Sequence, residues 1–223
     1  MKKLLLALFI LSSCVAGHTQ NNSIGNNDPD AKKILDEVSN KMKSYKSIQA
    51  TFTLKIEDAK GNPQATKKGT LSTKGNKYRL SLTGQEIFCD GKNVWTYDKS
   101  ANEVTVTKYD PSANTTMASP QKLLSNFYDK DFLYKLNGDQ KLGTKTVSEI
   151  EMTPVDKTKN FYKIYLYIDK ATKTIYSGKM LDKSGNRYLY TINSLNGKAV
   201  VSDAAFVFDK SKYPGVEVVD LGE

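Results

Sequence analysis

Apolar and polar residues follow two different periods along this chain of 223 residues. Between residues 28 and 46, apolar residues recur every three or four positions, which is typical of an amphipathic helix. Asp28 and Pro29 form a favourable helix start, because the aspartate can cap the first turn and proline fits its first position. The pattern therefore predicts a helix from Pro29 to about Lys46. Its apolar side carries Ile34, Leu35, Val38 and Met42.

From residue 50 the period changes to two, which indicates half-buried strands separated by turns rich in Gly, Asn and Asp. The predicted strands cover residues 50–56, 65–73, 77–82, 85–89, 93–97, 103–107, 146–152, 161–168, 174–181, 187–195 and 204–208. A second short helix is predicted to start at Ser119, with Leu123, Leu124 and Phe127 on one side. Short strands joined by tight turns predict one large antiparallel sheet.

A sheet of about eleven strands curls, and its apolar concave face is too broad to be filled by its own side chains. The two predicted helices can pack into this hollow through their apolar sides. If they fill it only in part, an apolar cavity remains that can bind apolar ligands. The alternative is a well-packed α+β core, and the residue pattern alone leaves both outcomes open.

The first residues have the pattern of a secretory signal. Lys2 and Lys3 precede an apolar run of only eight residues, and small residues follow up to Gly17. We expect residues 1–20 to be a signal peptide, 21–28 a disordered leader and 29–223 a single domain. The segment ending in Cys14 also resembles a lipobox, so the mature protein is either released into solution or anchored through a lipidated Cys14.

Charge and residue counts exclude several classes of function. The net charge of +9 falls to +7 when Lys2 and Lys3 are removed, which suits anionic membrane surfaces or acidic partners. No arginine cluster indicates nucleic acid binding. The one histidine, His18, lies in or beside the signal, so His-dependent nucleophilic catalysis and a histidine metal site are not expected. Beyond Cys14 only Cys89 remains, which excludes an intramolecular disulfide in the mature chain.

Several segments in a fixed order resemble one known family. They are Gly69–Lys74, Lys77–Leu80, Gln85–Asp98 and the strand from Glu103 to Thr107. This set resembles the outer-membrane lipoprotein carrier family, the LolA-like periplasmic proteins. The resemblance extends over nearly the whole mature chain, and its specificity comes from the ordered set rather than from any one motif.

The resemblance implies a mainly β protein with two short helices, in which an open, incomplete antiparallel β-barrel of about eleven strands is covered by a helical lid. It implies a monomeric periplasmic chaperone that carries the acyl chains of lipoproteins from the inner to the outer membrane. The implied partners are acylated lipoproteins, an inner-membrane lipoprotein-releasing ABC transporter, and an outer-membrane acceptor or the membrane surface. No enzymatic activity, cofactor, metal or nucleic acid is implied. The alternative is a membrane-anchored lipid- or lipoprotein-binding receptor of the same fold, if Cys14 is lipidated.

The resemblance and the apolar pattern together predict which residues line the lipid-binding cavity. They are Ile34, Leu35, Val38, Met42, Phe52, Leu54, Tyr78, Leu80, Leu82, Ile87, Trp95, Leu123, Leu124 and Phe127. Arg79 is a candidate contact of the lid or of the cargo. The Arg-Pro turn that latches the lid in some family members is replaced here by Lys74, Gly75 and Asn76, so the way the lid is held is open.

Overall fold

Twelve strands form one sheet in the part of the chain that the computed structural model describes, residues 27–110 and 128–222. The strands are β1 (Ile48–Glu57), β2 (Pro63–Lys74), β3 (Lys77–Leu82), β4 (Gln85–Cys89), β5 (Asn93–Asp98), β6 (Glu103–Lys108), β7 (Phe132–Leu142), β8 (Lys145–Pro154), β9 (Phe161–Asp169), β10 (Thr174–Asp182), β11 (Arg187–Asn196) and β12 (Glu217–Asp220). Their order in the sheet is β12-β6-β5-β4-β3-β2-β1-β11-β10-β9-β8-β7.

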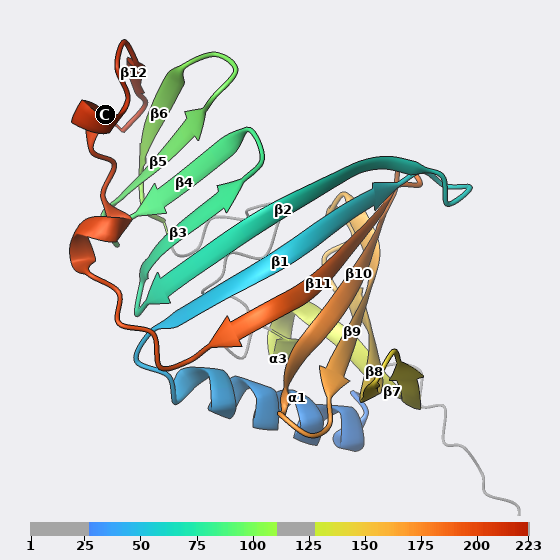
Figure 1. Cartoon of the computed structure of the whole chain (residues 1–223). Coiled ribbons are helices and arrows are strands. Elements are labelled where there is room, and N and C mark those ends of the chain that lie inside the picture. The colour runs from blue at the N-terminus through green and yellow to red at the C-terminus, as the bar shows by residue number, and fades with distance from the viewer. Residues whose placement is uncertain (1–26, 111–127, 223) are drawn as a thin grey trace, which may run out of the picture.

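The sheet is strongly curved and open, with β12 and β7 as its two edges (Figure 1). All neighbouring strands pair antiparallel except β12, which pairs parallel with β6. Strand β1 lies between β2 and β11 and thereby joins an N-terminal meander to a C-terminal one. The sheet is therefore an incomplete barrel, as predicted from the sequence, but with one more strand than expected.

Helix α1 (Pro29–Lys43) begins where the sequence predicts and is fastened to β7 at its N-terminus. The Asp28 carboxylate accepts hydrogen bonds from the backbone N–H groups of Asp30 and Leu136. The N–H of Tyr134 donates to the Asn27 side chain. Asn27 and Asp28, the end of the predicted leader, thus belong to the folded part, and the helix is placed against the sheet from its first turn.

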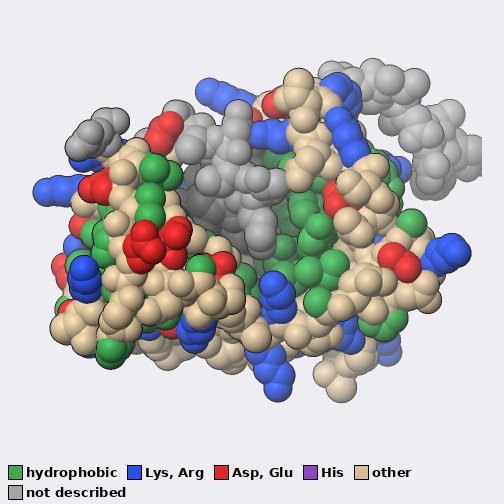
Figure 2. Space-filling view, turned by 90° about the horizontal axis from the view of Figure 1, so that it is seen from above, with side chains coloured by type: hydrophobic (Ala, Val, Ile, Leu, Met, Phe, Trp, Pro, Cys, Tyr) green, Lys and Arg blue, Asp and Glu red, His purple; other side chains and the backbone are tan. Residues whose placement is uncertain are grey.

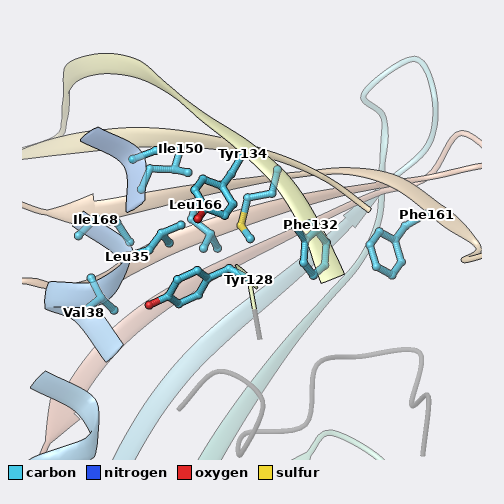
Figure 3. Close-up of a cluster of buried hydrophobic side chains, with 11 residues drawn as sticks. Leu35, Val38, Tyr128, Phe132, Tyr134, Ile150, Phe161, Leu166 and Ile168 are labelled. Atoms are coloured by element: carbon cyan, nitrogen blue, oxygen red, sulfur yellow. The ribbon is translucent and has the colours of Figure 1, made fainter. Parts of the chain in front are cut away.

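The first hydrophobic core lies between α1, the short helix α3 (Tyr128–Asp131) and one face of β7 to β9, which we call the inner face. Figure 3 shows Leu35 and Val38 of α1 facing Leu166 and Ile168 of β9. Ile150 and Met152 of β8 have no solvent exposure. A pocket between α1, Tyr128 and strands β9 and β10 holds about 10 Å³, which is room for about one water molecule. This end of the inner face is filled.

A second core lies on the opposite, outer face of the sheet, at β4 to β6. Phe88, Tyr97 and Val104 are covered there by Phe208 and Val216 of the C-terminal segment, residues 199–216. This segment includes the 3₁₀ helices η1 (Asp203–Phe206) and η2 (Lys210–Lys212). Aromatic rings meet edge to face and stacked at centroid distances of 4.6 to 6.5 Å, a favourable range for such pairs.

The predicted elements differ from the structure at three places. The strand predicted at 204–208 is wrong, because residues 203–206 form η1 and Phe206 packs with Ala199 and Val201. Strands β7 and β12 are absent from the sequence-based prediction. The second predicted helix, from Ser119 to Phe127, lies outside the described residues.

Candidate functional site

The inner face continues from the α1-covered core across five neighbouring strands, β11, β1, β2, β3 and β4. Directly paired residues of antiparallel strands point to the same face, so the strand register identifies which residues lie on the inner face. Leu80 of β3 lies between Leu71 of β2 and Ile87 of β4. Phe52 of β1 lies between Gly69 of β2 and Ile192 of β11. These pairs make one continuous apolar surface, and Figure 2 shows hydrophobic side chains inside a hollow of the molecule.

The leucine and isoleucine side chains of β3 and β4 on this surface are less buried than two apolar side chains of β1. Phe52 and Leu54 are buried, whereas Leu80, Leu82 and Ile87 are only half-buried. The contacts of α1 are mainly with β7 and β10, at the other end of the sheet. Apolar side chains that remain partly exposed on a concave face are available to an apolar ligand.

Gly69 is required by the close approach of a neighbouring ring. A Cβ atom at this position would lie 2.3 Å from Cζ of Phe52, a distance that real Cβ contacts do not show. The missing side chain lets the Phe52 ring extend over β2 on the inner face. Gly69 therefore determines where the Phe52 ring lies in the hollow.

Burial affects three ionisable groups on the inner face. Burial raises the pKa of Tyr78 to about 12, and the same cause raises the pKa of Tyr190 to about 12. Burial also raises the pKa of the Cys89 thiol, which contacts the carbonyl oxygen of Asn76 at 3.7 Å. Tyr and Cys side chains are mostly neutral at pH 7 even when exposed, so these three groups place no charge beside the apolar side chains.

The structure divides the predicted cavity residues into two described groups. Ile34, Leu35, Val38 and Met42 of α1 belong to the core with β7 to β9. Phe52, Leu54, Tyr78, Leu80, Leu82 and Ile87 share the inner face of β1, β3 and β4. Leu123, Leu124, Phe127 and the lipidation candidate Cys14 lie outside the described residues.

The prediction for Trp95 needs correction. Trp95 pairs with Phe88 and Val106 and packs on the outer-face core, so it lies on the opposite side of the sheet from Leu80. The physical reason is that apolar residues occur on both faces here, with Ile87 on the inner face and Phe88 and Trp95 on the outer face, which the C-terminal segment covers. Alternation alone does not tell which face is the hollow.

Arg79 is on the outer face as well and does not meet the hollow. Its Nη2 donates to Oε2 of Glu86 at 2.7 Å, and its guanidinium lies 4.7 Å from the centre of the Phe88 ring. The hydroxyl of Tyr213 also donates to Glu86, whose side chain is only 10% exposed. Arg79 therefore pairs with Glu86, which in turn accepts from Tyr213 of the C-terminal segment, so Arg79 acts on the outer face rather than in the hollow.

Residues that sequence reasoning missed come from β2 and β11. Leu71, Tyr190 and Ile192 lie on the inner face beside the predicted residues. Lys67 lies there too, directly opposite Leu54. The alternation within β2 is visible in the sequence, but only the pairing with β1 reveals which of its faces is the inner one.

The described part of the chain offers neither a metal site nor a helical membrane span. Within residues 27–110 and 128–222, no three His, Cys, Asp or Glu side chains are grouped so that they could hold a metal ion. No helix in these ranges is long and apolar enough to cross a membrane.

Comparison with known proteins assigns the chain to a family. The model of the family described as outer membrane lipoprotein carrier protein LolA matches residues 43–209, which is most of the chain. The chain belongs to the LolA family. The resemblance inferred from the ordered motifs is thereby confirmed.

Relatives of the LolA family match at modest identity over most of their length. An outer-membrane lipoprotein carrier protein of Klebsiella pneumoniae subsp. pneumoniae is 27% identical over 228 residues, covering 99% of this chain and 98% of the relative. A protein of the same name from Actinobacillus pleuropneumoniae serotype 3 is 25% identical, covering 86% and 85%. Among solved structures, an uncharacterised conserved protein of Thermus thermophilus has a TM-score of 0.57 at 15% identity, covering 86% of this chain and 99% of that one. This last likeness concerns the fold.

Membership in the LolA family gives the chain a lipoprotein-binding carrier role, with lipoproteins as cargo. The family is one of periplasmic carriers, and its members are binding proteins rather than enzymes.

Proposed function

We propose that this LolA family member binds the acyl chains of lipoproteins in the inner-face hollow and carries them through the periplasm to the outer membrane. The observation that carries the proposal is the contiguous, half-buried apolar surface of β3 and β4, next to the buried residues of β1. The α1 core uses the inner face at the other end of the sheet, so this surface is left for a ligand.

The energetics of acyl chains make such a carrier necessary. Each CH₂ group gains about 0.8 kcal/mol when it leaves water, so one lipoprotein acyl chain in water costs on the order of 10 kcal/mol. Unassisted transfer between two membranes is then negligibly slow. A hollow lined by Phe52, Leu80 and Ile87 supplies apolar contacts during transit without any chemical step.

The proposed route starts at an inner-membrane lipoprotein-releasing ABC transporter and ends at an outer-membrane acceptor or at the membrane surface. The protein is exported by the signal in residues 1–20, acts as a monomer, and needs no cofactor or catalytic group of its own. If Cys14 is lipidated, the same hollow serves a membrane-anchored receptor for lipids or lipoproteins. The lipobox-like segment ending in Cys14 favours that second candidate, and the intact mass of the mature protein distinguishes the two.

The substitution Leu80→Glu tests the hollow, with Thr70→Glu as the matched control. Leu80 is on the inner face, whereas Thr70 on the neighbouring strand β2 is exposed on the outer face. We expect both variants to stay folded, because a carboxylate in an open hollow can remain hydrated. Binding of a fluorescent diacylated lipopeptide should fall at least tenfold in Leu80→Glu, since the ligand must desolvate the charge. Thr70→Glu should bind like the parent.

Thermal unfolding of both variants separates a hollow from a packed core. In a packed core the buried carboxylate of Leu80→Glu would cost several kcal/mol and unfold much of the protein. Global unfolding of Leu80→Glu would therefore favour the filled core. A folded Leu80→Glu variant that binds the lipopeptide normally would contradict the assignment of this strand to the binding site.

A further inference from the structure

One charged side chain lies on the apolar inner face of the central strands. Lys67 of β2 pairs directly with Leu54 of β1, and Leu54 pairs in turn with Tyr190 of β11. Gly69, two residues further along β2, is on the same face against Phe52. At the paired inner-face positions of β11 and β1 to β4, all within the described residues, Lys67 is the only charged residue.

Lys67 differs from half-buried lysines such as Lys32, Lys77, Lys145 and Lys163, each of which pairs with a carboxylate. Ten lysines of the described segments form ion pairs with carboxylates, among them Lys32, Lys74 and Lys163. Within residues 27–110 and 128–222, Lys67 makes no ion pair or side-chain hydrogen bond. It is half-buried, whereas its neighbour Lys68, on the outer face of the same strand, is exposed.

An unpaired ammonium beside the hollow has an energetic consequence for binding. Acyl chains that fill the hollow displace water next to Lys67, and a charge that loses water without gaining a partner costs free energy. A carboxylate on the ligand, placed near the acyl chains, would offset this cost through a charge-assisted hydrogen bond in surroundings of low polarity. The inner-face positions of these described strands provide no carboxylate for this purpose.

We infer that the hollow selects acylated ligands that carry a carboxylate close to their acyl chains, and that Lys67 pairs with this carboxylate. The inference rests on the proposed function, because it assigns a ligand chemistry to the same hollow. The apolar surface alone does not provide this selectivity.

Two synthetic diacylated lipopeptides test the selectivity, one with Asp and one with Asn directly after the acylated cysteine. The two ligands have nearly the same size and differ in one charge. Affinities are measured for the parent protein and for Lys67→Met, Lys67→Arg and Lys68→Met. Lys68→Met is the matched control, because it removes one positive charge from the adjacent position on the opposite face.

We expect the parent, Lys67→Arg and Lys68→Met to bind the Asp lipopeptide about tenfold more tightly than the Asn lipopeptide. Lys67→Met should bind both equally, with its affinity for the Asn lipopeptide unchanged or improved. Equal affinities in the parent, or a preference that persists in Lys67→Met, would overturn the inference while leaving the proposed function intact. Binding of neither lipopeptide by the parent would contradict the proposed function itself.

Discussion

At the end of the sheet formed by β7 to β10, helix α1 covers the inner face, whereas at β4 to β6 the C-terminal segment covers the outer face. Each end thus has its own hydrophobic core, and the two cores lie on opposite sides of one sheet. The second core stabilises its strands without using their inner face. This arrangement explains how a curved sheet can be well packed and still leave apolar side chains of β3 and β4 half-buried on its inner face, as the proposed binding of acyl chains requires.

The largest expected effect comes from truncating the filled end. Ile150 has no solvent exposure and lies in the α1 core, so Ile150→Ala should lower the free energy of unfolding by about 3 kcal/mol through lost burial and a cavity. Leu80→Ala, on the half-buried surface, should cost about 1 kcal/mol or less. Urea unfolding followed by circular dichroism measures both. Equal losses would mean that the two ends are packed alike.

A smaller effect is expected at the fastening of the C-terminal segment. Arg79→Ala removes the main partner of the largely buried Glu86 carboxylate and should lower the free energy of unfolding by about 2 kcal/mol. Lys74→Ala is the control, because the Lys74–Asp203 pair is exposed and contributes less than about 1 kcal/mol. A loss in Arg79→Ala no larger than in the control would show that aromatic packing alone holds the segment.

The smallest expected effect concerns Trp95. Because it packs on the outer-face core, its fluorescence should not change when a lipopeptide fills the hollow, but should shift to longer wavelength in Phe208→Ala. Emission spectra of the parent and of Phe208→Ala, with and without lipopeptide, measure both responses. If the fluorescence of Trp95 in the parent protein changed on addition of the lipopeptide, ligand binding on the inner face would alter the packing of the outer-face core.

Local sequence signals predict most of the sheet but not its faces. Ten strands and the start of α1 follow from alternation, turn residues and the Asp-Pro helix start. Strand β7 escapes prediction because the bulge between Leu136 and Gly138 interrupts its alternation, and Gly138 adopts a φ of 114° there. Strand β12 has only four residues, too few to show a period.

Long-range packing accounts for the errors in the candidate site. The apolar run from Ala204 to Phe208 looks like a strand, but it provides Phe206 and Phe208 to two different clusters. The sequence pattern places Trp95 in the hollow because nothing near it in sequence indicates that residues more than 100 positions later cover its face. Conversely, the position of Lys67 on the inner face requires the register of β2 against β1.

An open sheet, unlike a closed barrel, has two edge strands whose backbone N–H and C=O groups are unpaired on one side. Such edges can pair with a strand of another molecule, and this pairing often initiates aggregation. Both edges here carry features that hinder such strand addition. The β7 edge contains the bulge at Gly138 and the outward lysines Lys135 and Lys141. The β12 edge is short and acidic, with Glu217 and Asp220 exposed. The bulge distorts one edge and the other edge offers only four residues, so few backbone groups are arranged to pair with a second sheet, and the sheet can stay open without further strands being added to it.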